Sequence, residues 1–295
     1  MNNLKEILTF NKLFLLIGHV FKLITILLLI IMPMIHILNV IPFYFNYYPF
    51  PIAILFVLLS FYFILYINMM YYRCITIKRY PTYNITHLHD FYQGELEQSP
   101  FTLCSKCQKL RPFRCHHCRF CEECIYRMDH HCSWIGNCVG DHNIRYFLLF
   151  IFSLSLSCLL GAVTQIPYER TTKITKALYT LECVLGITLL IYGECHFYLM
   201  LTNQTTLEFA GNLTFYFSQP KQIRKWITPY DWGWKKNVEM VLKYENVWEL
   251  FNPFALQKDC DFMKVDVVDE FVDHADFVDE FVLKNEINET KNVDN

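Results

Sequence analysis

The stretch that decides the fold is residues 104–138, which read CSKCQKLRPFRCHHCRFCEECIYRMDHHCSWIGNC. It holds eight of the thirteen cysteines of the 295-residue chain, together with four histidines. Cysteines at this density indicate disulfides in an oxidising compartment, and metal binding or catalysis in a reducing one. The chemistry of this stretch therefore depends on the compartment in which it lies.

Overlapping Cys-x-x-Cys pairs run through this stretch. They are Cys104/Cys107, Cys115/Cys118, Cys118/Cys121 and Cys121/Cys124. A two-residue gap lets both thiolates of a pair reach one tetrahedral Zn²⁺ at about 2.3 Å. One such pair is a weak signal, but several with histidines between them predict a loop stapled by zinc, because the stretch has little regular apolar pattern with which to fold unaided.

The cysteines and histidines outnumber the ligands that two four-coordinate zinc ions need. Cys132 directly follows Asp129, His130 and His131. A cysteine beside a histidine, with an aspartate to orient the ring, is the arrangement of an activated thiol. We therefore predict a catalytic set in which Cys132 is the nucleophile, His130 takes its proton and Asp129 orients His130. The imidazolium formed would favour the thiolate at neutral pH.

The rest of the chain is strongly apolar. Hydrophobic residues make up 54% and charged residues 18%, whereas soluble domains carry roughly a quarter charged residues. Four segments are long and apolar enough to cross a membrane. They lie within residues 13–40 (spanning from about residue 23), and at about 51–70, 146–163 and 178–201. The fold class predicted is an all-α polytopic membrane protein, with four transmembrane helices and a two-zinc cysteine-rich domain between the second and third.

Basic residues that flank the helices indicate the orientation of the loop. Three follow the second apolar segment: Arg73, Lys78 and Arg79. Because cytosolic flanks carry an excess of Lys and Arg, the loop and both termini are predicted to face the cytosol. Three more, in the loop between the third and fourth segments, favour the opposite orientation: Arg170, Lys173 and Lys176. We place the loop in the cytosol because its thiolates need a reducing side.

The chain divides at these segments. The predicted parts are 1–70 (N-terminal segment and helices one and two), 71–145 (cytosolic loop, zinc-binding core 104–147), 146–201 (helices three and four), 202–258 (cytosolic C-terminal segment) and 259–295 (acidic tail). The tail repeats Val-Asp-Glu-Phe-Val and is predicted to be disordered. The net charge of −2 gives no general attraction to nucleic acid.

Residues 104–147 resemble the cysteine-rich domain of the DHHC protein S-acyltransferases (palmitoyltransferases), a family named after the four residues found here at Asp129–Cys132. Matches in this stretch are Arg111-Pro112, Arg114, Asp129-His130-His131-Cys132, Trp134-Ile135, Asn137-Cys138-Val139-Gly140, Asn143 and Phe147. Matches farther on are His196, Leu199, Asn203, Thr205-Thr206-Leu207-Glu208 and Tyr230-Asp231-x-Gly233-x-x-x-Asn237. The chain departs from the family at Leu242-Lys243, where Phe-Gly is usual.

The resemblance implies a protein S-acyltransferase that carries a long-chain acyl group from acyl-CoA, such as palmitoyl-CoA, through a Cys132 thioester to cysteines of membrane-associated proteins. It also implies two structural Zn²⁺ ions. One would be held by Cys104, Cys107, His117 and Cys124, the other by Cys118, Cys121, His131 and Cys138. We expect Cys115 to be a buried small hydrophobe. An endomembrane location is expected, with the endoplasmic reticulum and Golgi favoured over the plasma membrane or vacuole.

Two other classes compete with the enzyme. A non-catalytic membrane zinc-finger adaptor needs no Asp129–Cys132 motif, so the intact motif argues against it. A membrane-embedded ubiquitin ligase needs a late Cys-x-x-Cys pair for cross-braced zinc binding, which this loop lacks. The enzyme is therefore the preferred interpretation. Protein substrates, acyl-chain length and oligomeric state do not follow from these residues.

Overall fold

The computed structural model describes residues 2–77, 101–108, 110–165, 173–221, 226, 228, 230–244, 246–252 and 254. The predicted acidic tail at 259–295 and the basic residues Lys78, Arg79 and Arg170, on which the orientation argument partly rests, lie outside these residues.

Four long helices build the bundle that carries the site. They are α1 (Asn2–Asn39), α3 (Phe50–Thr76), α5 (Ile144–Gln165) and α6 (Lys173–Leu201). Each is long and apolar enough to cross a membrane, and many of their leucines, isoleucines and valines face outward, as lipid-facing side chains do. The prediction of four transmembrane helices is confirmed, and the chain is an integral membrane protein.

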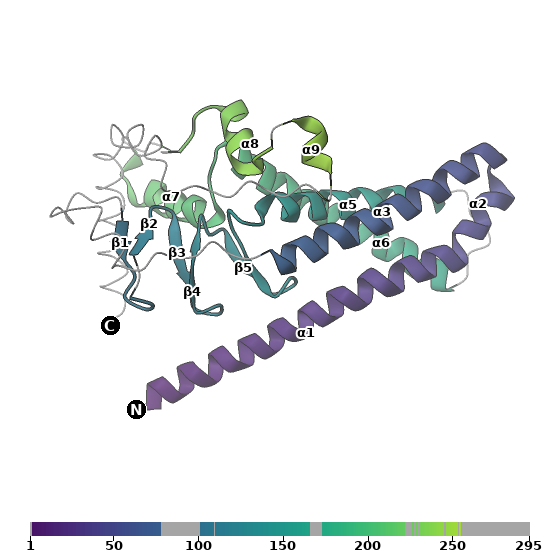
Figure 1. Ribbon diagram of the computed structural model, residues 1–295. Coiled ribbons are helices and arrows are strands. Elements are labelled where there is room, and N and C mark those ends of the chain that lie inside the picture. The colour runs from purple at the N-terminus through teal and green to yellow at the C-terminus, as the bar shows by residue number, and fades with distance from the viewer. Residues whose placement is uncertain are drawn as a thin grey trace.

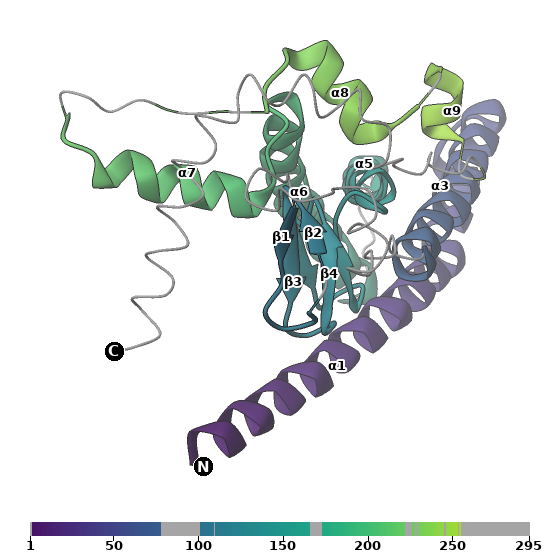
Figure 2. The same cartoon turned by 60° about the vertical axis from the view of Figure 1, so that its left-hand side comes forward.

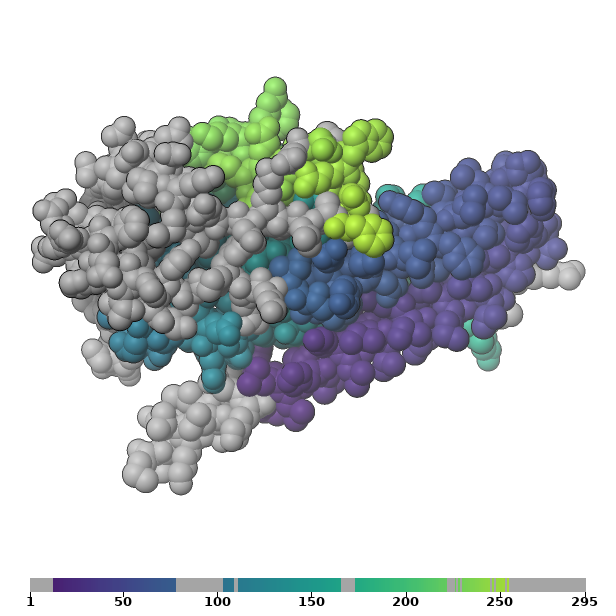
Figure 3. Space-filling model, viewed as in Figure 1, coloured from purple at the N-terminus to yellow at the C-terminus, as the bar shows by residue number. Residues whose placement is uncertain are grey.

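Helix α1 is longer than a membrane span requires. Its 38 residues measure about 57 Å, whereas the hydrocarbon core of a bilayer is about 30 Å thick. Beyond the bundle, Phe14 stacks on Phe120 of the cysteine-rich loop, with ring centroids 3.9 Å apart. Phe21 lies 4.6 Å, centroid to centroid, from Trp134. The helix thus runs along the bundle and on past the loop (Figure 1), and it lies beside α3 on one face of the molecule (Figure 3).

The connection between the first two spans is more ordered than its sequence suggests. The chain folds there into the short helix α2 (Ile41–Tyr47), which starts with a proline in its first turn. Tyr44 is 2% exposed, and its hydroxyl lies 2.9 Å from that of Thr164 on α5. This hydrogen bond joins α2 to α5 and closes the end of the bundle that lies away from the cysteine-rich loop.

The cysteine-rich loop forms three small antiparallel hairpins rather than helices. Their strands are β1 (Phe101–Leu103) with β2 (Leu110–Pro112), β3 (Cys115–Cys118) with β4 (Glu123–Tyr126), and β5 (His130–Cys132) with β6 (Asn137–Val139). Two-stranded hairpins are barely stable alone, so something else must hold them together. Metal ions bound by their many cysteines would supply that stabilisation.

Three helices follow the bundle: α7 (Thr206–Ser218), α8 (Trp234–Leu242) and α9 (Val247–Phe251). Together with the hairpins they lie at one end of the bundle, and the N-terminal end of α1 points to the same end (Figures 1 and 2). The hairpins, α7–α9 and the start of α1 therefore lie on one side of a membrane that the four helices cross.

Candidate active site and metal centres

Two clusters of cysteine and histidine side chains form in the hairpins, each with its possible ligand atoms within 4.8 Å of one another. The first contains Cys104, Cys107, His117 and Cys124, and the second Cys118, Cys121, His131 and Cys138. These are the two ligand sets implied by the family resemblance. Each cluster has the residues and the spacing to hold a metal ion.

Distances within the clusters fit a tetrahedral zinc ion. Ligands at 2.1–2.3 Å from one such ion lie about 3.4–3.8 Å apart. The Cys124 sulfur is 3.8 Å from His117 Nδ1, and the Cys107 and Cys124 sulfurs, at 3.3 Å, are slightly closer than this range. In the second cluster, His131 Nδ1 lies 3.4 Å from the Cys121 sulfur and 3.6 Å from the Cys138 sulfur.

The hairpins interleave the two clusters. His117 lies opposite Cys124 in the β3–β4 pair, and His131 opposite Cys138 in the β5–β6 pair. Cys118 and Cys121, from the β3–β4 hairpin, join the second cluster. Since the β3–β4 and β5–β6 hairpins each supply a facing pair of ligands, and the β3–β4 hairpin serves both clusters, metal at the two sites would brace the loop.

Cys132 lies at the end of β5 and is 8% exposed. His130, two residues earlier on the same face of the strand, contacts it and donates from Nδ1 to Asp129 Oδ2 at 2.7 Å. The three residues predicted to be catalytic are therefore brought together. Burial alone would lower the pKa of His130, but its bonds to Asp129 and Cys132 outweigh burial and raise the pKa to about 9. An imidazolium is thus favoured beside the sulfur.

Asp129 is held as a buried anion. It is 4% exposed, and burial alone would raise its pKa. The hydrogen bond and charge of His130 outweigh this and keep the pKa below its usual range. Thr206, at the start of α7, donates its backbone N–H to Asp129 Oδ1 at 2.9 Å and its hydroxyl to the Asp129 backbone carbonyl. Helix α7 is thereby coupled to the catalytic loop.

A capping box sets the start of α7. Glu208 N–H donates to the Thr205 hydroxyl at 3.2 Å, and Thr205 N–H donates to the Glu208 carboxylate at 2.9 Å. The same carboxylate accepts a bidentate pair from Arg114, with N···O distances of 2.6 and 2.8 Å. Thr205 and Glu208 therefore brace the start of α7, and Glu208 also joins it to the cysteine-rich loop.

Asn203 links three parts of the molecule. It is 1% exposed and ends α6 in the left-handed region at φ 49°, a conformation that asparagine tolerates. Its side-chain oxygen accepts from Arg127 at 2.6 Å and from Arg114 at 3.2 Å, and its amide donates to the Tyr230 carbonyl at 2.8 Å. The cysteine-rich loop, α6 and the C-terminal segment therefore meet at one buried amide.

Two asparagines fix the loop to the end of α3. The side chains of Asn137 and Asn143 both donate to the Cys74 carbonyl, at 3.1 and 3.2 Å. The Tyr71 hydroxyl donates to the Trp134 carbonyl at 3.0 Å. These bonds hold Cys132 at the mouth of the helical bundle.

Lys243 occupies the position at which the chain departs from the family pattern. It ends α8 in the left-handed region at φ 49°, where glycine costs least, and its ammonium pairs with the buried carboxylate of Asp141. Val241 and Leu242 remain buried against the core. The ion pair thus keeps α8 packed on the cysteine-rich loop without the usual Phe-Gly.

A cavity of about 800 Å³ runs from this mouth into the bundle. Cys132, His130 and Trp134 line it at the loop, while most of its length is apolar side chains of α1, α3, α5 and α6. At its far end His36 Nε2 lies 3.2 Å from the Ser60 hydroxyl, and Gln165 donates to Glu182 at 2.6 Å. The site thus joins a cysteine–histidine–aspartate set to a deep apolar space.

The sequence did not predict the surroundings of two residues close to the site. His196 is 4% exposed and lies beside Asp129. Arg127 is buried against Asn203. In both cases the partner lies far along the chain, so no local pattern shows it. Cys115 is 4% exposed, and burial raises its pKa to about 12, as expected of a buried neutral thiol.

Fold and site together define a polytopic membrane protein with a two-cluster cysteine-rich loop and a buried cysteine–histidine–aspartate site. Comparison with known proteins adds to this description. Residues 97–212 match the model of the family described as DHHC palmitoyltransferase. The resemblance to this family that the sequence predicts is therefore confirmed over these residues.

Three relatives show the extent of the similarity. The chain is 33% identical to mouse palmitoyltransferase ZDHHC2 over 171 residues, which cover 54% of this chain and 45% of the relative. It is 34% identical to probable protein S-acyltransferase 14 of Arabidopsis thaliana over 151 residues, or 47% and 46% of the two chains. Identity to human palmitoyltransferase ZDHHC2 reaches 51% over 65 residues, 22% of this chain and 18% of the relative. The aligned part spans about half the length of the first two relatives.

Proposed function

We propose that this protein is a protein S-acyltransferase that moves a long-chain acyl group from acyl-CoA to cysteine thiols of other proteins. The observation that carries the proposal is the position of Cys132, which contacts His130 and also opens into the apolar cavity. One sulfur thus has a base beside it and room for a hydrocarbon chain behind it. The names of the aligned relatives support the same reaction.

In the first step the Cys132 thiolate attacks the thioester carbonyl of acyl-CoA. The carbon–sulfur bond to CoA breaks, CoA leaves as a thiolate that takes up a proton, and Cys132 becomes an acyl thioester. In the second step a cysteine thiolate of the protein substrate attacks the same carbonyl and releases Cys132. His130 accepts the thiol proton in each half of the cycle, and Asp129 orients its ring.

The depth of the cavity fits a long chain. His196, beside Asp129, and Glu182, at the polar end, are fourteen positions apart on α6, which is about 21 Å along the helix. An extended alkyl chain advances about 1.25 Å per carbon, from bonds of about 1.5 Å at near-tetrahedral angles, so sixteen carbons span about 20 Å. Burial of each methylene contributes about 0.8 kcal/mol. A palmitoyl-sized chain therefore fills the distance from sulfur to polar end.

The two cysteine–histidine clusters would each hold one structural Zn²⁺ ion. Zinc bound there would fix the three hairpins, and with them the position of His130 and Cys132, without taking part in the reaction. Because bound zinc requires thiolates, we place the loop, both termini and the active site in the cytosol. This orientation also brings Cys132 to the cytosolic membrane surface, where acyl-CoA and lipid-anchored substrates meet.

The test is incubation of the purified protein with a clickable palmitoyl-CoA and an acceptor peptide that carries one cysteine. The proposal predicts label on the acceptor, lost when the acceptor cysteine is replaced by serine. A zinc adaptor without catalysis would label neither protein nor peptide. The orientation is tested separately by a protease site inserted next to Phe101 in sealed microsomes: a site that resists external protease would contradict the cytosolic placement.

A further inference from the structure

His196 is a buried histidine without a role in the reaction as described so far. It lies in the last turns of α6 and is 4% exposed. Its ring packs against Tyr192, Phe147 and His130, with centroid distances of 4.6, 5.6 and 5.8 Å. Ionisable residues at membrane depth are costly and usually face a functional site. Here the ring faces the carboxylate of Asp129.

Asp129 lies between two imidazole rings. Its Oδ2 accepts from His130 at 2.7 Å and is 3.9 Å from His196 Nδ1. Its Oδ1 accepts the backbone N–H of Thr206. The 3.9 Å separation is longer than a direct hydrogen bond, and catalytic contacts of this length often shorten when substrate binds. His196 is thus close enough to act on the same oxygen that orients His130.

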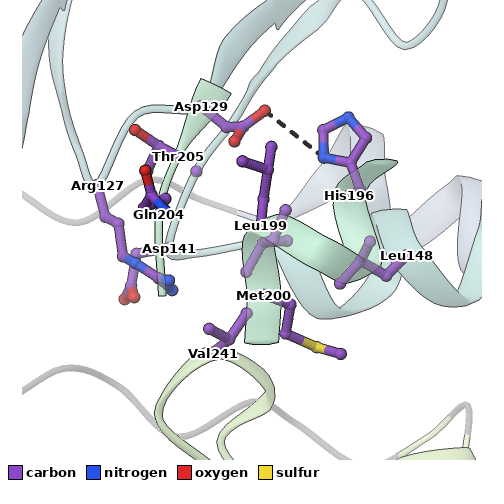
Figure 4. A pocket seen from close by; sticks show the side chains of 12 residues that line it. Arg127, Asp129, Asp141, Leu148, His196, Leu199, Met200, Gln204, Thr205 and Val241 are labelled. Carbon is purple, nitrogen blue, oxygen red and sulfur yellow. Dashed lines mark ion pairs between the residues drawn. The ribbon is translucent and has the colours of Figure 1, made fainter. Parts of the chain in front are cut away.

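A small cavity of about 20 Å³ adjoins this contact (Figure 4). Asp129 and His196 face each other on one side of it, and Arg127 and Asp141 lie on the other. A space of this size with several polar walls holds one water molecule. Two buried nitrogens on its lining residues, His196 Nε2 and Arg127 Nε, have no hydrogen-bond partner within the described part of the chain. A water here can bond a lining group such as Arg127 Nε and connect it to the carboxylate of Asp129.

We propose that His196 is a positioning residue for acyl transfer. Together with Thr206, and with a water in the small cavity, it fixes the carboxylate of Asp129 so that Asp129 keeps the His130 ring aimed at Cys132. The His130 ring passes a proton in each half of the cycle, so the Asp129 carboxylate must keep its orientation while that hydrogen bond changes. Thr206 holds the carboxylate from one side, and His196, near the same oxygen that His130 bonds, limits its rotation from another. The inference rests on the proposed acyltransferase function.

The experiment compares three variants of the full-length protein in single-turnover acylation by palmitoyl-CoA. His196→Phe keeps a ring for packing but has no polar atom, whereas His196→Asn keeps an N–H donor at the position of Nδ1, the ring nitrogen that faces Asp129. Cys195→Ala, at an exposed neighbouring position on α6, is the control. For each, zinc content, melting temperature, maximal rate and half-saturating palmitoyl-CoA concentration are measured.

His196→Phe is expected to lower the maximal rate at least about tenfold, the size of effect that loss of a hydrogen bond to a charged group produces. The half-saturating concentration and zinc content should stay at the wild-type values. His196→Asn should recover most of the rate, and Cys195→Ala should match wild type. Equal losses in the Phe and Asn variants would reduce His196 to packing and overturn the proposal, as would a wild-type rate in His196→Phe.

A comparison of His196→Asn with His196→Gln keeps the proposal testable if His196→Phe does not fold. His196→Gln carries its donor one atom farther along the side chain, at the position of Nε2 rather than of the Nδ1 that faces Asp129, so it must be slower than His196→Asn by about fivefold or more. Equal rates in this pair would contradict the positioning role. Failure of the proposed function would look different, because wild-type protein itself would then take no label from palmitoyl-CoA.

Discussion

The ion pair between Arg114 and Glu208 is expected to hold the cysteine-rich loop on α7. The Arg114 and Glu208 side chains are 7% and 16% exposed, and two N–H···O bonds of 2.6 and 2.8 Å join them. Arg114 also donates to the Asn203 carbonyl at 2.7 Å. Arg114→Met keeps much of the side-chain volume but leaves the Glu208 carboxylate buried and unpaired. Removal of one partner of such a pair costs about 3–5 kcal/mol.

The assay is thermal unfolding of the detergent-purified protein together with its zinc content. A loss of this size should lower the melting temperature by roughly 10 °C in a domain of this size. The double variant Arg114→Met/Glu208→Gln should be more stable than the sum of the single effects predicts, by about 1.5 kcal/mol or more, because it leaves no buried charge. Arg119→Met, at an exposed arginine of the same loop, should cost about 1 kcal/mol or less. Single effects that add within about 0.5 kcal/mol would refute the reasoning, since the two side chains would then act independently.

Three further predictions concern zinc, the base and pH. His117→Ala and Cys138→Ser should each reduce bound zinc from two ions to one and lower the yield of folded protein, because such sites supply folding energy; active wild-type protein with fewer than two zinc ions would contradict the ligand sets. His130→Ala should slow acyl-enzyme formation about 100-fold with both zinc ions retained, and loss of zinc would show that the two adjacent histidines are assigned in the wrong order. Burial alone would raise the pKa of Glu208, but Arg114 outweighs it and holds the pKa below the usual 4.5. The stability that Glu208 adds is thus fully present above pH 4.5 and is lost as pH falls through the lowered value, so the difference in melting temperature between wild type and Glu208→Gln should narrow below pH 4.5; a constant difference would contradict the ionised pair.

The spans and the gathering of the cysteine-rich loop were predictable because their signals are local. Twenty apolar residues in a row indicate a membrane helix whatever surrounds them, and the four helices contain the predicted segments. Cys-x-x-Cys spacing likewise reports a metal knuckle before any fold is known. Asp129, His130 and Cys132 are neighbours in sequence, so their contact follows from a single strand.

The contacts that hold the site in place were harder to predict because they join residues far apart in the chain. Arg114 meets Glu208 across 94 positions, and Thr206 meets Asp129 across 77. His196 gave the opposite impression, since a histidine near the end of a span suggests hydration, whereas the packing of α5 against α6 buries it. Hairpins in the loop were also missed, because their strands are only three or four residues long and carry ligands in place of an alternating apolar pattern.

The central claim is that Cys132 carries the acyl group, and peptide mapping of the enzyme after a single turnover with palmitoyl-CoA tests it most directly. We predict a palmitoyl adduct on the peptide that contains Cys132, which neutral hydroxylamine removes as it does other thioesters. Cys132→Ser should show no adduct while it keeps two zinc ions and its membrane insertion, because a serine hydroxyl is hardly ionised at neutral pH. An adduct that persists on Cys132→Ser, or zinc lost with that single change, would contradict the account.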